Sequence, residues 1–238
     1  MARVTEVAVC QQRSIVVDVA VAGRWRRDDL GGWHYVDLNQ SAIAPHSGGS
    51  KPAPVTFLTL PVNLDEASLR KRRLWRALSP VQRALLATDG SFTLLLQALA
   101  GEEVCVKTLS QTVNSASCAD ETLALCAGED VMMRSALLHT SSGRKLVYAR
   151  SRIVPHRLSR SIVDELQVGA MAIGLIFRRA KIELFRELVD WGECVLAGEG
   201  CEQLGETRCI YRSYTMNSGG HPVAEITEFF PCTLFAGQ

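Results

Sequence analysis

The stretches VMMRSALL at residues 131–138 and VAEITEFF at residues 223–230 decide the fold. Both follow the period-two pattern of strands, in which every second side chain lies on the same face. On the first strand, Arg134 falls on a face whose other members are apolar: Met132, Ala136 and Leu138. On the second strand, Glu228 is placed in the same way among Ala224, Ile226 and Phe230. Each strand therefore carries one charge where a core is expected.

A buried charge without a partner is strongly disfavoured, so Arg134 and Glu228 each require one. They would be satisfied by an ion pair with each other, by another side chain, or by a bound ligand. A slip of one residue in the strand assignment would move every side chain to the other face of the sheet. A further interpretation is therefore that Arg134 and Glu228 lie on an exposed face. The ligand interpretation predicts a pocket with an anion clamp at one end and a carboxylate at the other.

The chain has 238 residues, 47% hydrophobic and 21% charged, which is typical of a globular protein with a sizeable core. We expect one domain over residues 63–238 and an N-terminal extension over residues 1–62. In the extension, Ser14–Ala22 and Trp33–Leu38 are predicted to form a hairpin around a charged turn at Gly23–Gly32. Ser41–Pro54 has the Ser, Gly and Pro content of a linker.

Composition disfavours several classes of protein. The net charge of +1 gives no reason to expect nucleic acid or an anionic membrane as a partner. No run approaches the roughly 18 apolar residues of a membrane span. The eight cysteines form no CxxC pair and lie beside no histidine at metal-ligand spacing, so no metal is expected. Because Val7–Cys10 is too short for a secretory signal, we expect a cytoplasmic protein with reduced thiols.

Capping signals predict four helices. Ser79, Pro80 and Gln82 have the spacing of a capping box with proline at the first helical position. Gly101 and Gly169 are placed to end later helices. The predicted helices span residues 63–76, 79–87, 94–99 and 159–166.

Strand patterns and turns fill most of the remaining chain. The predicted strands span residues 103–110, 131–138, 146–154, 207–216 and 223–230. The turns TSSGRK at 140–145 and NSGGH at 217–221 make the strands around them antiparallel hairpins. Residues 111–130 are predicted to be irregular, and residues 181–191 fit helix and strand equally. No phosphate-cradling glycine motif occurs. The fold class expected is α+β, with an antiparallel sheet and separate helices.

Five motifs, in order, resemble those of chorismate pyruvate-lyases over about residues 64–235. They are TDGSFTLLL (88–96), RSALL (134–138), VYARSRIVP (147–155), GAMAIGLIF (169–177) and RSYTMNSGGHPVAEITEFFP (212–231). The resemblance implies a lyase that converts chorismate to 4-hydroxybenzoate and pyruvate, without metal or organic cofactor. It also implies an antiparallel sheet with helical flaps over a buried ligand pocket.

Site residues follow from the resemblance position by position. Arg134 would hold the ring carboxylate and Glu228 would meet the ring hydroxyl. The backbone amides of Phe92 and Ile173 would assist Arg134. The small-molecule partner is thus a chorismate-like carboxylate. One departure from the family is Ala172-Ile173-Gly174, where a proline-leucine-glycine is usual.

Two alternatives remain open at this point. One is a related enzyme recruited to a different substrate, and the other is a non-catalytic sensor like the effector-binding domains of transcription regulators. The sensor is disfavoured because residues 1–62 show strand and loop patterns in place of a basic pair of DNA-reading helices. Arg212 shares a predicted strand face with Tyr214 and is a candidate second carboxylate ligand. Arg152 is predicted to be a surface charge.

Overall fold

The computed structural model describes residues 23–27, 33–37 and 66–237. In the N-terminal part, β1 (Gly23–Arg27) pairs antiparallel with β2 (Trp33–Asp37). A hairpin is therefore present, but its first strand lies in the segment predicted as a turn, because charged residues in GRWRR do not prevent extended backbone. The predicted strand Ser14–Ala22 and the linker Ser41–Pro54 lie outside the described residues.

The described residues divide between two compact units. The smaller unit holds the β1–β2 hairpin and residues 66–73, and the larger unit begins at Leu74. The expected boundary between residues 62 and 63 stays a prediction.

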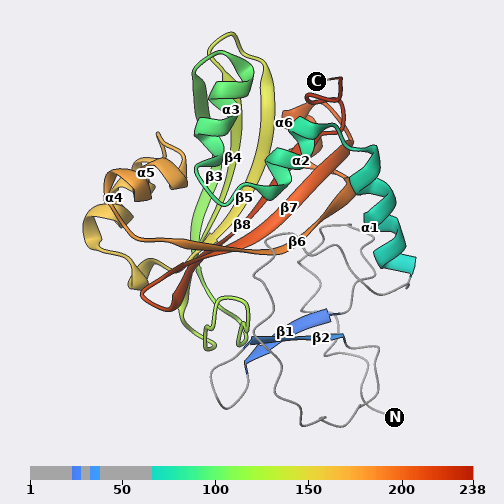
Figure 1. Ribbon diagram of the computed structural model, residues 1–238. Coiled ribbons are helices and arrows are strands. Elements are labelled where there is room, and N and C mark those ends of the chain that lie inside the picture. The colour runs from blue at the N-terminus through green and yellow to red at the C-terminus, as the bar shows by residue number, and fades with distance from the viewer. Residues whose placement is uncertain (1–22, 28–32, 38–65, 238) are drawn as a thin grey trace, which may run out of the picture. The chain divides into compact units, whose positions relative to one another are not determined.

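The larger unit is built on one antiparallel sheet, and the α+β fold class is confirmed. Six strands follow one another across it in the order β3-β4-β5-β8-β7-β6 (Figure 1). Their bounds are β3 Val104–Ser115, β4 Asp130–Thr140, β5 Lys145–Ile153, β6 Phe185–Val195, β7 Arg208–Ser218 and β8 His221–Pro231.

Two strands differ from expectation. β3 extends through Ser115, into the segment predicted to be irregular, because its polar end pairs with β4 as far as Ser115 opposite Asp130. β3 is an edge strand, so polar side chains at its end cost little. The ambiguous residues 181–191 contribute to β6, which pairs with β7 along its length.

The helices begin and end mainly where their caps predict. Their bounds are α1 Glu66–Ala77, α2 Pro80–Ala87, α3 Phe92–Ala100, α4 Arg160–Val168, α5 Ile173–Arg179 and α6 Glu199–Leu204, with a short 3-10 turn η2 at Pro155–Arg157. Ser79 and Gln82 form the predicted capping box. Gly101 and Gly169 end α3 and α4 with φ of 69° and 72°, which favours glycine. Sequence reasoning missed α5 and α6, which have seven and six residues; helices this short show little apolar periodicity.

Most helices cover one face of the sheet. Side chains of α4 and α5 pack on alternate residues of β4, β5, β7 and β8: Met132, Ile153, Met216 and Ala224. α3 contacts both β3 and α5, as Figure 1 shows at the upper left of the sheet. α6 lies on the opposite face against β5, and a Cβ at Gly200 would come within 2.8 Å of the Tyr148 ring. The face that carries Arg134 is therefore the one beneath α2 to α5.

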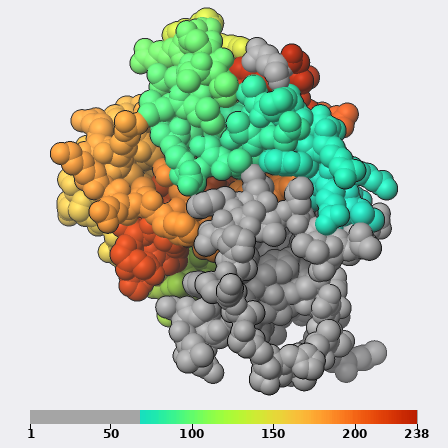
Figure 2. Space-filling model, viewed as in Figure 1, coloured from blue at the N-terminus to red at the C-terminus, as the bar shows by residue number. Residues whose placement is uncertain are grey.

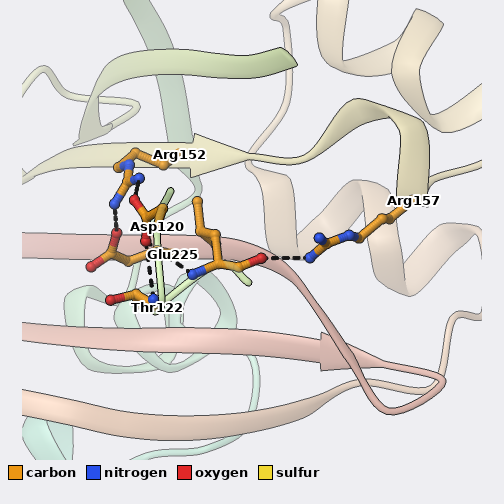
Figure 3. A network of polar contacts seen from close by, with 6 residues as sticks. Asp120, Thr122, Arg152, Arg157 and Glu225 are labelled. Atoms are coloured by element: carbon orange, nitrogen blue, oxygen red, sulfur yellow. Dashed lines mark hydrogen bonds and ion pairs between the residues drawn. The ribbon is translucent and has the colours of Figure 1, made fainter. Parts of the chain in front are cut away.

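Residues 116–129 form an ordered lobe held by two arginines (Figure 3). Arg152 pairs with both Asp120 and Glu225, and its side chain is only 19% exposed. The prediction of Arg152 as a surface charge is therefore wrong, because the lobe covers it. Arg157 donates to the carbonyl oxygens of Leu123, Ala124 and Pro222.

Within the described residues, no helix is long and apolar enough to cross a bilayer.

Candidate functional site

Strand register places the two predicted charges on the same face. Arg134 lies opposite Ser151 on β5, and two residues further along β5 Ala149 lies opposite Glu228 on β8. Two steps between strands of about 4.8 Å and a two-residue offset of about 6.6 Å separate their Cα atoms by about 12 Å. The β5 side chains between them, Ala149 and Ser151, are small. A flat ring therefore has a floor of small side chains between a cation and a carboxylate.

Arg134 is 3% exposed, and only one nitrogen of its guanidinium donates hydrogen bonds within the described residues. Its Nη2 donates to Thr108 Oγ1 at 2.8 Å and to the carbonyl oxygens of Gly169 at 3.1 Å and Met171 at 2.9 Å. Nε and Nη1 are buried without an acceptor among the described residues. Burial lowers the pKa of the guanidinium, since no carboxylate within the described chain contacts it. The free donors need an acceptor, and an anion would also supply the missing countercharge.

Glu228 is 6% exposed, and its charged partner is Arg212, not Arg134. Its Oε2 accepts from Arg212 Nε at 2.7 Å, and its Oε1 accepts from the Tyr214 hydroxyl at 3.2 Å. Burial and the neighbouring carboxylate raise the pKa of Tyr214, so the hydroxyl keeps its proton. The ion pair between Arg134 and Glu228 is not formed.

Arg212 is the most deeply buried charge of this face, at 1% exposure. Its Nη1 donates to the carbonyl oxygens of Leu85 and Thr88 at the end of α2, both at 2.8 Å. The guanidinium carbon lies 4.1 Å from the centroid of the Phe92 ring and 5.0 Å from that of Tyr214. Its Nη2 is buried without an acceptor in the described part of the chain.

Phe92 and Ile173 occupy equivalent positions in the covering helices. Each is the first residue of its helix, α3 and α5, and each is buried. The first amides of a helix have no partner within it. Ser91 makes no side-chain cap on α3, and its Oγ is buried without a partner among described groups. Both amide positions are therefore at helix starts that no side chain caps.

Three arginines of the sheet donate hydrogen bonds to backbone carbonyl oxygens in the segments that precede α3 and α5. Arg134 holds the loop between α4 and α5, and Arg212 holds the end of α2. Arg186 Nη1 donates to the Asp89 carbonyl oxygen at 2.9 Å, and a Cβ at Gly174 would lie 3.7 Å from its Nη2. The space-filling view shows α3, in green, next to the α4–α5 segment, in orange, at the surface (Figure 2). The charged residues thus lie beneath two helical segments.

The pattern of charges suits a ligand with an acidic group and a polar ring substituent. Sequence reasoning identified Arg134 and Glu228 by their apolar faces, and it named Arg212 without its pairing to Glu228. No cluster of three or more His, Cys, Asp or Glu residues is arranged to hold a metal in the described ranges.

Comparison with known proteins gives consistent matches. Residues 86–237 match the family model described as "Chorismate pyruvate-lyase Rv2949c-like". The chain is 32% identical over 158 residues to a chorismate pyruvate-lyase of Mycobacterium leprae, covering 64% of this chain and 75% of the relative. Identity to the chorismate pyruvate-lyase of Mycobacterium tuberculosis H37Rv is 28% over 172 residues, or 67% and 84% of the two chains.

Solved structures with a related shape include the effector domain of PhnF from Mycobacterium smegmatis. The TM-score is 0.49 with 14% identity, over 60% of this chain and 88% of that chain. The candidate site residues of the sheet and of the two helix starts all lie inside the range matched by the family model: Arg134, Arg212 and Glu228, with Phe92 and Ile173.

Proposed function

The chain belongs to the Rv2949c-like chorismate pyruvate-lyase family, and we propose on this premise that it removes pyruvate from chorismate to give 4-hydroxybenzoate. The observation that carries the proposal is the buried guanidinium of Arg134, which has unpaired donors on Nε and Nη1. A carboxylate supplies both the acceptors and the charge that this group lacks.

In this proposal Arg134 binds the ring carboxylate. Nε carries one N–H group and Nη1 carries two, so three donors are available to the carboxylate oxygens. The amides of Phe92 and Ile173, at the starts of α3 and α5, add donors from the covering segments. The Nη2 bonds to Gly169 and Met171 hold the guanidinium in place without using the ligand-binding donors.

At the other end of the ligand, Glu228 accepts a hydrogen bond from the ring hydroxyl. Arg212 and Tyr214 each occupy one position on its carboxylate, and each oxygen retains a further lone pair for a ligand. The separation of about 12 Å between the Cα atoms of Arg134 and Glu228 leaves room for a ring between two side chains that reach toward it.

The reaction needs orientation more than chemical assistance. The bond between the ring and the ether oxygen breaks, and its electron pair leaves with the enolpyruvyl oxygen. The ring proton from the hydroxyl-bearing carbon is lost, its electron pair completes the aromatic ring, and enolpyruvate takes up a proton to become pyruvate. Aromatisation drives the reaction, so the protein contributes by fixing the substrate and excluding water.

The test is to mix the purified full chain with chorismate and follow both products. Pyruvate is measured by coupling to lactate dehydrogenase, and the aromatic product is separated chromatographically against the isomeric hydroxybenzoates. We expect equal amounts of pyruvate and 4-hydroxybenzoate. Binding of 4-hydroxybenzoate without any pyruvate release would refute the lyase assignment and favour a relative recruited to another substrate.

A further inference from the structure

We propose that Arg212 is a second anion-binding residue, which receives the carboxylate of the leaving enolpyruvyl group on Nη2. The inference rests on the proposed function for the identity of the substrate, and on the bonding of Arg212 for the site. It gives this residue a role in distinguishing the dicarboxylate substrate from the monocarboxylate product.

An inventory of the Arg212 donors shows what remains for a ligand. A guanidinium has five N–H groups: one on Nε and two on each terminal nitrogen. Nε donates to Glu228, and Nη1 donates to the carbonyl oxygens of Leu85 and Thr88. Nη2 has no acceptor among the described residues although it is fully buried. Three bonds thus orient the group, and one nitrogen is left for an acceptor that those residues do not provide.

The surroundings of Arg212 restrict how an acceptor can approach. The rings of Phe92 and Tyr214 lie 4.1 Å and 5.0 Å from the guanidinium carbon. Aromatic rings at these distances attract the cation and exclude water. Since Nε and Nη1 are occupied, the ligand approach that remains is toward Nη2. A carboxylate at that position replaces a buried, unsatisfied donor with a charge-assisted hydrogen bond.

The chemistry of the substrate places its second carboxylate on this side. In chorismate the hydroxyl and the enolpyruvyl ether stand on adjacent ring carbons. If Glu228 accepts a hydrogen bond from the hydroxyl, the ether on the adjacent carbon lies near the side chains that surround Glu228. Arg212 lies directly opposite Glu228 in the sheet and touches it, whereas Arg134 lies about 12 Å away by Cα position. Arg212 is therefore the buried cation next to the leaving group.

The number of carboxylates differs between substrate and product, and an anion site at Arg212 would distinguish the two molecules. Chorismate carries two carboxylates and 4-hydroxybenzoate carries one, so Arg212 has an anionic ligand only before pyruvate leaves. Contacts made to the substrate and the departing group, and absent from the product, raise kcat/KM without strengthening product inhibition. Loss of Arg212 should then affect turnover and dicarboxylate binding more than product binding.

The experiment compares two ligands by calorimetry on the full chain. One is 4-hydroxybenzoate, and the other is 3-(carboxymethoxy)-4-hydroxybenzoate, which adds an ether-linked carboxylate beside the hydroxyl. We expect the wild type to bind the dicarboxylate at least about tenfold more tightly, and Arg212→Gln to lose that preference. Arg152→Gln is the matched control, because Arg152 also pairs with a glutamate of β8, Glu225, but on the opposite face of the sheet. It should keep the preference.

Arg212→Lys provides a second variant if the glutamine variant does not fold. A lysine ammonium has three donors and cannot serve Glu228, the two α2 carbonyls and a ligand at once. We expect kcat/KM for chorismate to fall at least about tenfold, with the inhibition constant of 4-hydroxybenzoate within about threefold of wild type.

Equal losses for both ligands in the variants, or an unchanged dicarboxylate preference, would overturn the inference in favour of a purely structural arginine. A wild type with no preference would overturn it as well. Failure of the lyase assignment is a separate result: the protein would release no pyruvate, while an Arg212-dependent preference for the dicarboxylate would still establish the anion site.

Discussion

Replacing Arg134 by lysine tests the proposed carboxylate site while keeping the positive charge. The guanidinium of Arg134 donates from Nη2 to Thr108, Gly169 and Met171, and leaves Nε and Nη1 for a ligand. A lysine ammonium has three donors at a single point. It cannot hold the α4–α5 loop and two oxygens of a carboxylate at the same time.

The expected magnitude follows from the bonds that are lost. A hydrogen bond to a charged group contributes about 1.5–3 kcal/mol. Loss of one such bond to the ligand corresponds to roughly 10- to 150-fold weaker binding. Titration calorimetry with 4-hydroxybenzoate measures this change directly, and thermal unfolding shows whether the variant keeps its fold.

Arg152→Lys is the matched control for this experiment. Arg152 lies between Ser151 and Ile153 on β5, so its side chain is on the opposite face of the sheet from Arg134, where it pairs with Asp120 and Glu225. We expect this control to leave ligand affinity within about threefold of wild type, because the ion pairs of Arg152 lie on the face away from the proposed site and lysine keeps the positive charge. An Arg134→Lys variant that binds like wild type, or an Arg152→Lys variant that loses as much, would refute the reasoning.

Three further predictions concern catalysis, domain organisation and thiol reactivity. Glu228→Gln keeps the size of the side chain but removes its charge and its capacity to take up a proton, so it should lower kcat by about 100-fold or more and weaken 4-hydroxybenzoate binding far less; wild-type pyruvate release by the variant would eliminate a role of Glu228 in the transition state. Deleting residues 1–60 should leave turnover largely intact, and loss of all soluble protein would show that the extension belongs to the main fold. Burial raises the pKa of Cys194 and Cys209 to about 12, so at pH 8 both should resist iodoacetamide in the folded protein. Mass spectrometry should show faster labelling of the exposed Cys118 and Cys126, and equal rates for all four would contradict the burial argument.

Local signals in the sequence determined the helix ends and the faces of the charged strands. The Ser79 and Gln82 capping box forms as predicted, because each bond joins groups only three residues apart. Gly101 and Gly169 end helices because the left-handed backbone there favours glycine. Alternation likewise placed Arg134 and Glu228 on apolar faces, since a strand's side-chain period is independent of its partners.

Register between strands decided which charges meet, and only the tertiary structure supplied it. At the β7–β8 turn, Ser218 lies opposite His221, and continuing that count would put Arg212 opposite Thr227. An irregularity between Met216 and Asn217 shifts the pairing by one residue, so that Arg212 lies opposite Glu228. One inserted residue turns every following side chain to a new partner, and nothing in the local sequence marks where it falls.

The covering of the site was likewise decided by contacts between distant segments. Arg134 bonds to carbonyl oxygens of residues 169 and 171, and Arg212 bonds to those of residues 85 and 88. These acceptors are backbone atoms that every residue carries, so the sequence has no pattern that predicts them. Sequence therefore determined that two charges lie on the buried face, while the folded chain decided that Glu228 pairs with Arg212 and that Arg134 keeps donors free for a ligand.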